Sequence, residues 1–116
     1  MAQFAAIYAS NSYLRIANSI PVSVSNNTVM SLGAFGFIGG SKVILQNLNF
    51  INNTSFATAS TIYISSLSSG TISDTSFRNN FAAKIGTVLI EGDSSVNFTR
   101  CIFTENYAGD SGAVFI

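Results

Sequence analysis

The side chains that most often carry out catalysis or bind metals are scarce in this chain. There is no histidine and no tryptophan, and Cys101 is the single cysteine among 116 residues. Serine–histidine–aspartate catalysis, cysteine–histidine catalysis and histidine-ligated metal sites therefore cannot be built from these residues. Without a histidine to activate it, Cys101 is expected to be a buried, inert thiol. The sequence predicts a protein that is not an enzyme and that binds no cofactor.

The acidic residues are the remaining candidates for metal binding. Glu91 and Asp93 form the only close pair, on either side of Gly92. This pair fits either a weak cation site or a solvated turn, because two carboxylates fall short of the roughly six to eight oxygen ligands that Ca²⁺ takes. The other acidic residues occupy three different positions of the repeat described below: Asp74, Glu105 and Asp110. We therefore expect no metal site.

Composition excludes further classes of partner. Five lysines and arginines balance five acidic residues, so no basic surface is available to bind nucleic acid or anionic lipid. Charged residues make up only 9% of the chain, its mean hydropathy is +0.41, and 39 residues are serine, threonine or asparagine. Polar residues interrupt the uncharged stretch 16–41 too often for a membrane-spanning helix of about 20 residues. The first ten residues lack the regions of a secretory signal, so we expect a piece of a longer exported chain.

Apolar residues and asparagines repeat at regular intervals along the chain. A large apolar residue followed three positions later by asparagine begins at residues 24, 50, 77 and 103, with spacings of 26, 27 and 26 residues. The repeat units are therefore 24–49, 50–76, 77–102 and 103–116. Alternating apolar pairs follow each start at 35/37, 62/64, 88/90 and 114/116, and further alternation precedes the later starts. This period of two predicts short strands with one buried face.

Three short strands in each unit fit a coil that returns to the same place after every turn. In a parallel β-helix, equivalent residues of successive coils stack at about 4.8 Å. We therefore predict an all-β, parallel β-helix that forms a single segment over residues 1–116. An internal apolar stack and an internal amide ladder follow from the repeat. Their members are Phe50, Phe77 and Phe103, and Asn27, Asn53, Asn80 and Asn106.

Asparagine suits the ladder for two reasons. It tolerates the left-handed backbone that a sharp corner requires, and its amide can bond to the copies in the coils above and below. Charges give an independent check of the register, because Asp74 falls beside Arg100 and Lys84 falls beside Asp110. Exposed pairs of this kind contribute about 0–1 kcal/mol each, so they specify register more than stability.

The repeated elements resemble those of a known family. F-x-x-N occurs at residues 50–53, 77–80 and 103–106, and is followed by I-G-T-V at 85–88 and S-G-A-V at 111–114. Over residues 24–116 this resembles the paired F-x-x-N and G-G-A-I repeats of the polymorphic outer-membrane protein family. The resemblance implies a right-handed parallel β-helix of the pectin-lyase-like class that serves as a surface adhesin. Val24 in place of phenylalanine, and A-S-T-I at 59–62 without glycines, depart from the pattern.

Four asparagines match the acceptor pattern for N-glycosylation: Asn26, Asn52, Asn53 and Asn97. Asn26 and Asn52 share an outward column, and Asn97 precedes an inward phenylalanine. These three are therefore the predicted glycosylation sites. Asn53 belongs to the internal ladder, and we expect it to carry no glycan.

Together these observations predict a non-enzymatic structural or adhesive module of an extracellular or cell-surface protein, such as a segment of a fibre or filament. The alternative is part of a carbohydrate-active domain, a polysaccharide lyase or a glycan-binding module, whose site lies outside this segment. An uncapped β-helix exposes unpaired strands at its ends. The expected partners are therefore further coils of the same chain or copies stacked end to end, with a surface glycan or protein as a further ligand. Neither nucleic-acid binding nor a membrane span is expected.

Overall fold

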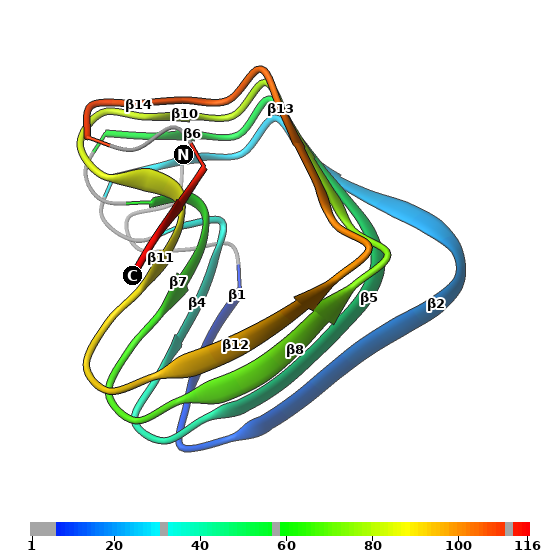
Figure 1. Ribbon diagram of the computed structural model, residues 1–116, viewed down its shortest axis with the longest axis vertical. Coiled ribbons are helices and arrows are strands. Elements are labelled where there is room, and N and C mark those ends of the chain that lie inside the picture. The colour runs from blue at the N-terminus through cyan, green and yellow to red at the C-terminus, as the bar shows by residue number, and fades with distance from the viewer. Residues whose placement is uncertain (1–6, 31–32, 57–58, 111–112) are drawn as a thin grey trace.

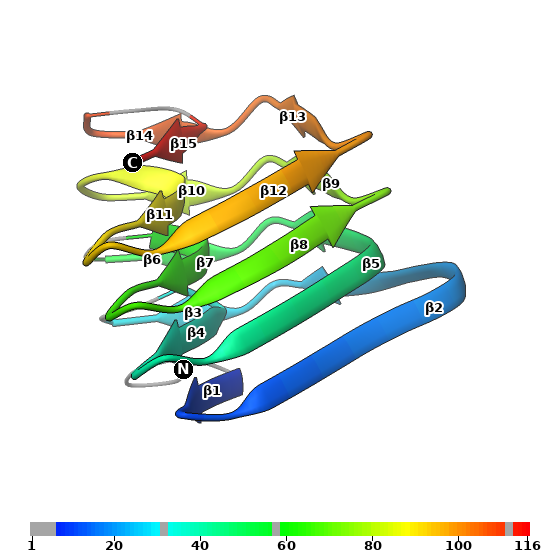
Figure 2. The same ribbon diagram turned by 60° about the horizontal axis from the view of Figure 1, so that its bottom comes forward.

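The computed structural model describes residues 7–30, 33–56, 59–110 and 113–116, without the side chains of residues 60 and 115. Every regular element in these ranges is a strand, and all the strand pairings are parallel. Figures 1 and 2 show the chain winding through about four coils that stack on one another. The predicted all-β parallel β-helix is therefore confirmed.

The coils build three parallel sheets. Sheet I consists of β1 (Ile7–Ser10), β4 (Phe35–Ile38), β7 (Ala59–Ile64), β11 (Gly86–Ile90) and β15 (Val114–Phe115). Sheet II consists of β2 (Tyr13–Ser25), β5 (Lys42–Ile51), β8 (Ser69–Ser73), β9 (Ser76–Arg78), β12 (Ser95–Thr99) and β13 (Ile102–Thr104). Sheet III consists of β3 (Thr28–Val29), β6 (Thr54–Ser55), β10 (Phe81–Ala82) and β14 (Tyr107–Ala108).

Phenylalanines stack along the interior of the coil, as the repeat predicts. The rings of Phe50 and Phe77 lie 5.1 Å apart and within 3° of parallel, and those of Phe77 and Phe103 lie 4.5 Å apart. Phe35 of sheet I meets Phe50 edge to face at 5.2 Å, which joins the stack to the opposite wall. Val24 takes the same column in the first coil. The stack therefore connects successive coils along sheet II, and the Phe35–Phe50 contact joins it to sheet I.

The predicted asparagine ladder is also present, and its hydrogen bonds repeat from coil to coil. The backbone N–H and Nδ2 of Asn53 both donate to Asn80 Oδ1, at 2.9 and 3.0 Å. Asn53 Nδ2 also donates to the Val24 carbonyl in the preceding coil at 2.9 Å. Asn27 and Asn80 donate in the same way to the next asparagine of the ladder. Because both amide protons and the amide oxygen are bonded, a buried polar side chain is accommodated without an unsatisfied group.

A serine column, which the apolar repeat did not reveal, runs along the corner between sheets I and II. The backbone N–H groups of Ser12, Ser41 and Ser68 donate to the hydroxyl of the serine one coil further on, at 3.3, 3.1 and 3.0 Å. The last acceptor is Ser94. Serine is common in this sequence, so its recurrence at 12, 41, 68 and 94 does not stand out without the known register.

The left-handed backbone at the corner between sheets II and III belongs to the residue before each ladder asparagine. Asn26, Asn52, Asn79 and Glu105 have φ values of 57°, 56°, 53° and 56°. The prediction that the ladder asparagines themselves adopt this conformation was wrong. All four corner residues are exposed, because the turn that redirects the chain points their side chains outward and the next side chain inward.

The first strand of sheet II contains a large bulge. Ala17 pairs with Gln46 and Val22 with Leu48, so residues 18–21 stand opposite the single residue 47. The only proline, Pro21, lies in this bulge, where its missing N–H interrupts no regular pairing. The flanking segments 13–17 and 22–25 keep regular register with β5.

Phe77 and Phe81 provide a matched test of the core. Phe77 is fully buried, whereas Phe81 is 39% exposed on the outer face of sheet III. Phe77→Ala should lower the free energy of unfolding by about 3–5 kcal/mol, because it opens a cavity between two stacked rings. Phe81→Ala should cost less than about 1.5 kcal/mol, since part of the ring is already in water. Urea unfolding measures both, and equal losses would contradict the assigned interior.

Variants of Asn79 and Asn80 distinguish the contribution of the corner residue to stability from that of the ladder residue. Asn80→Gly removes the amide that binds the Phe50 carbonyl and Asn106 Oδ1, and should destabilise the fold by at least about 2 kcal/mol. Asn79→Gly keeps a residue that tolerates positive φ, and should change stability by less than about 0.5 kcal/mol. The same denaturation experiment decides it. A larger loss for Asn79→Gly than for Asn80→Gly would show that the ladder is not the stabilising element.

Candidate functional site

Arg100 and Asp74 form the ion pair that the repeat register predicts. Arg100 Nε and Nη2 donate to the two Asp74 carboxylate oxygens at 2.5 and 2.9 Å. Gln46, one coil before Asp74, donates to the same carboxylate at 3.5 Å. The hydrogen bonds from Arg100 hold the pKa of Asp74 below its usual value. Because the arginine side chain is 68% exposed, this contact marks register more than it adds stability.

Lys84 and Asp110 are neighbours in register without forming an ion pair. The Asp110 N–H donates to the Lys84 carbonyl at 2.7 Å, which places the two residues in adjacent coils as predicted. In the described ranges, the Asp74–Arg100 contact is the one ion pair between side chains. Both Lys84 and Asp110 are exposed, so water solvates their charges without the ordering that a contact would require.

Glu91 faces a tyrosine of the preceding coil. The Tyr63 hydroxyl donates to Glu91 Oε1 at 2.5 Å. Burial, followed by this hydrogen bond, raises the pKa of Tyr63 above its usual value of 10.0. Within the described part of the chain, no three histidine, cysteine, aspartate or glutamate side chains come close enough to hold a metal ion. Within the turn that contains Glu91 and Asp93, the observed role of Glu91 is to accept the hydrogen bond from Tyr63.

Cys101 packs against the core, but the prediction of a buried thiol is met only in part. It is half-buried, and its thiol is 3.3 Å from the Ile72 carbonyl and 3.5 Å from that of Thr99. The equivalent residue one coil earlier, Thr75, makes the corresponding contact to the Ser73 carbonyl at 2.8 Å. Both side chains thus serve as local donors to the bend of sheet II.

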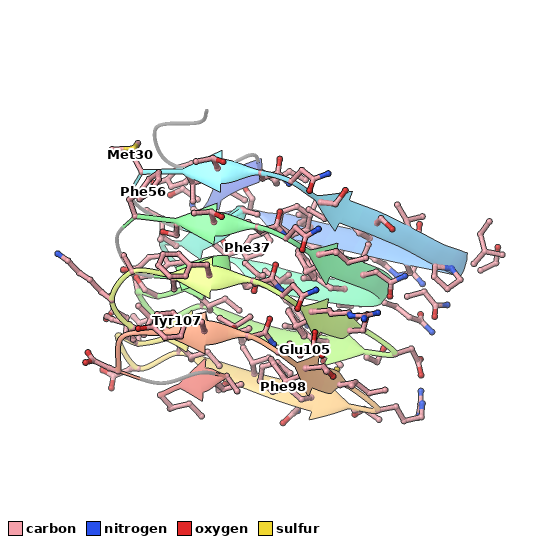
Figure 3. All side chains as sticks on the ribbon, turned by 90° about the horizontal axis from the view of Figure 1, so that it is seen from above. Met30, Phe37, Phe56, Phe98, Glu105 and Tyr107 are labelled. Atoms are coloured by element: carbon pink, nitrogen blue, oxygen red, sulfur yellow. The ribbon has the colours of Figure 1, made fainter. Side chains whose placement is uncertain are left out.

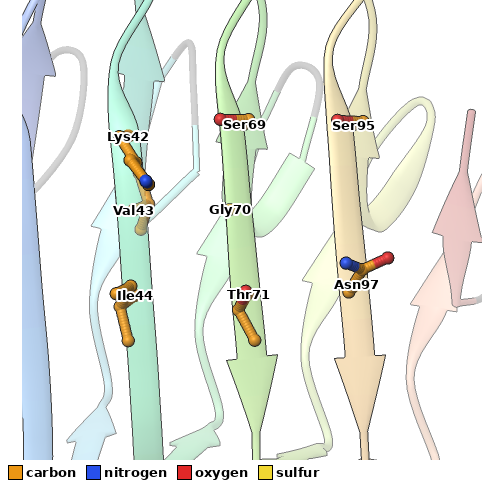
Figure 4. A pocket seen from close by; sticks show the side chains of 8 residues that line it. All are labelled: Lys42, Val43, Ile44, Ser69, Gly70, Thr71, Ser95 and Asn97. Atoms are coloured by element: carbon orange, nitrogen blue, oxygen red, sulfur yellow. The ribbon is translucent and has the colours of Figure 1, made fainter.

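A shallow polar groove of about 370 Å³ lies on the outer face of sheet II (Figure 4). Outward side chains of β5, β8 and β12 line it: Lys42, Ile44, Ser69, Thr71, Ser95 and Asn97. One ammonium group, hydroxyls and an amide can hydrogen-bond a polyhydroxylated or weakly anionic ligand. The residues fall at two outward positions of the repeat, but only the pairing of three strands brings them together.

An apolar ridge occupies the outer face of sheet III. Phe81 and Tyr107 stack 5.2 Å apart in adjacent coils, and Tyr107 is 60% exposed. Met30 and Phe56 are also exposed, and Figure 3 shows them on the same side of the sheet as Tyr107. Pairing of β10 with β14 brings Phe81 and Tyr107 together, which the sequence analysis did not predict. Phe81 and Tyr107 are the two members of this ridge whose rings stack on each other.

The structure places the predicted glycosylation sites at the surface. Asn26 and Asn52 are exposed at the corner between sheets II and III, and Asn97 is exposed on β12. Asn53 is fully buried within the ladder. Exposure of the first three is the geometry that an attached glycan requires.

Comparisons with known proteins assign this chain to no family. No family model, no curated protein and no solved structure matches this chain. No helix long and apolar enough to cross a membrane occurs among the described residues. The resemblance to the F-x-x-N repeats therefore stays a proposal.

The Tyr63–Glu91 contact predicts a measurable shift in tyrosine ionisation. The fold raises the pKa of Tyr63, so the folded state favours the neutral phenol. This stabilisation is fully present at pH values below the ordinary pKa of tyrosine, and it is lost as the pH rises through the raised pKa. Glu91→Gln should lower the pKa of Tyr63, since it removes the carboxylate acceptor and its negative charge. Absorbance titration of tyrosinate measures it, with Tyr63→Phe identifying the signal. Coincident curves for the wild type and Glu91→Gln would contradict the contact.

Proposed function

We propose that this chain is a non-enzymatic structural or adhesive module of an extracellular or cell-surface protein, and forms part of a fibre or filament. The observation that carries the proposal is the internal asparagine ladder, whose hydrogen bonds repeat without interruption from Asn27 to Asn106. Each described coil is bonded to the next in the same way. A structure of this kind can be lengthened by adding coils without redesigning its core.

The charged residues support a structural role over a catalytic one. Glu91 is bonded to Tyr63 and Asp74 to Arg100, which uses two of the five acidic residues in contacts within the coil stack. The remaining ones, Asp93, Glu105 and Asp110, are exposed at different corners. Among the described residues, these acidic groups do not converge on a common point, whereas general acid–base catalysis requires groups within reach of one reacting atom.

Three features support an extracellular location. Asn26, Asn52 and Asn97 combine the acceptor pattern with exposure. The surface is rich in hydroxyl and amide groups and poor in charge. The F-x-x-N repeats resemble those of a family of surface adhesins. The outer faces of sheets II and III are the surfaces available to a glycan or protein ligand, since the inner faces are filled by the core.

Glycan mapping of native material tests this proposal. If the protein is exported from a cell that attaches N-linked glycans, peptide mass mapping should find modification at Asn26, Asn52 or Asn97. Asn53 should be bare, because its amide is bonded to Asn80 and a sugar cannot fit inside the packed coil.

Surface labelling of intact cells with a reagent that cannot enter them provides the control. The protein should be labelled, or recovered from the medium. Recovery only from the cell interior would contradict the proposed location, and glycan on Asn53 with bare Asn52 would contradict the assigned corner.

A further inference from the structure

The polar side chains of the groove on sheet II differ from those of the inward columns in having no partner within the protein. The ladder asparagines and the corner serines hydrogen-bond from coil to coil. Within the described part of the chain, the polar side chains that line the groove are exposed and bond to no other protein group. They are those of Lys42, Ser69, Thr71, Ser95 and Asn97. An ammonium group, three hydroxyls and an amide are therefore available to another molecule.

The middle strand, β8, forms the floor of the groove because its outward side chains are short. Ser69 and Thr71 lie between the side chains of β5 and those of β12. Figure 4 shows Lys42 and Ile44 on one side of β8 and Asn97 on the other. The volume of about 370 Å³ is at the lower end of the roughly 300–1,000 Å³ that ligand sites occupy. The groove therefore fits a short stretch of a longer ligand.

Positive charge on the outer face of sheet II is not balanced by acidic residues. Lys42 is exposed on β5, and Arg15 is exposed on the neighbouring strand, β2. Neither side chain forms an ion pair within the described ranges. Among the acidic residues closest to these strands, Asp74 is bonded to an arginine, and Asp93 lies in the turn before β12, two strands away from Lys42. The face therefore attracts an anionic group, to which lysine and arginine donate strong, charge-assisted hydrogen bonds.

The neutral groups of this face match those of a sugar. Serine and threonine hydroxyls and the asparagine amide both donate and accept hydrogen bonds, as sugar hydroxyls do. Tyr13 pairs with Lys42 and is 60% exposed, so it adds an aromatic ring with an apolar face and a polar tip. Nucleic acid carries a phosphate on every nucleotide and requires a denser basic surface than two separate cations.

We propose that the outer face of sheet II binds an acidic polysaccharide whose chain runs along the axis of the coil stack. One column of equivalent outward positions sets this direction: Tyr13, Lys42, Ser69 and Ser95. Because neighbouring strands are about 4.8 Å apart, the column extends over about 14 Å. Lys42 binds a sugar carboxylate, and Asn97 bonds to hydroxyls further along the chain. This inference rests on the proposed adhesive role, and it names the class of ligand.

Titration of a labelled acidic polysaccharide with the full 116-residue chain tests the site. The protein is produced in a bacterium, because Asn97 is also an acceptor for N-linked glycan and an attached glycan would occupy the groove. Fluorescence anisotropy of hyaluronan oligosaccharides at low salt measures the affinity. Lys42→Gln should weaken binding by at least about fivefold, since it removes the cation in the groove. Lys84→Gln removes an exposed lysine elsewhere, and should change the affinity by less than about twofold.

A second pair of variants adds charge instead of removing it. Asn97→Asp keeps the shape of the side chain and places a negative charge in the groove, so it should weaken binding by at least about fivefold. Asn79→Asp adds the same charge at the exposed corner between sheets II and III, where aspartate tolerates the positive φ, and should change the affinity by less than about twofold. Circular dichroism and urea unfolding verify that all four variants fold. Equal affinities within either pair would overturn the proposed site.

Changing the ligand tests the chemistry of recognition. Hyaluronan with methyl-esterified carboxylates should bind at least about tenfold more weakly than the unmodified chain, because the charge-assisted bonds are lost. Polysialic acid distinguishes two sources of a sugar carboxylate: tighter binding than hyaluronan would identify a sialic acid, weaker binding would identify a uronic acid, and each supports the inference.

Three results with these ligands would overturn the inference. They are equal binding of the ester and the acid, binding of neither glycan, and tighter binding of poly-glutamate than of both glycans, which would indicate an acidic protein instead. Glycan mapping and surface labelling do not depend on the groove. Failure here therefore leaves the proposed location and structural role separately testable.

Discussion

The hydrogen bonds of the asparagine ladder are the constraint on which the rest of this structure depends. A buried amide is tolerated only if its two protons and its oxygen all find partners. Here that condition is met only when an identical amide lies one coil away in each direction, as Asn53 shows with Asn27 and Asn80. The ladder therefore fixes the coil length at the corner and the register of the strands on either side. A slip of one residue would place Asn79, which is exposed, inside the coil.

The phenylalanine stack supplies the apolar counterpart of the ladder. Phe50 and Phe77 are fully buried and lie nearly parallel, three positions before their ladder asparagines. Because the ring and the amide are only three residues apart, the same turn of the backbone fixes the positions of both. Apolar burial stabilises the coil without specifying direction, whereas the amide bonds allow one register. Together they explain how a chain with few charged residues adopts one ordered structure.

Because the ladder and the stack occupy the interior, chemistry directed at other molecules is confined to the outer faces of the sheets. The outer faces carry a polar groove with a single lysine and a ridge of aromatic side chains. This distribution agrees with a role in which the molecule supports, extends or attaches, since the ionisable groups that do interact bind partners within their own coil stack.

The sequence by itself determined the coil period, the strand positions, the phenylalanine and asparagine columns and the Asp74–Arg100 pair. Each depends only on which residues recur every 26 or 27 positions, and stacking turns recurrence into contact. The tertiary structure decided which residue of each corner is left-handed, how residues 18–21 leave the sheet, and that Lys84 and Asp110 stay apart. It also brought Lys42, Thr71 and Asn97 into one groove. The physical reason is that period and polarity specify which side of a strand faces the core, whereas backbone turns and long exposed side chains adopt conformations set by their neighbours in space.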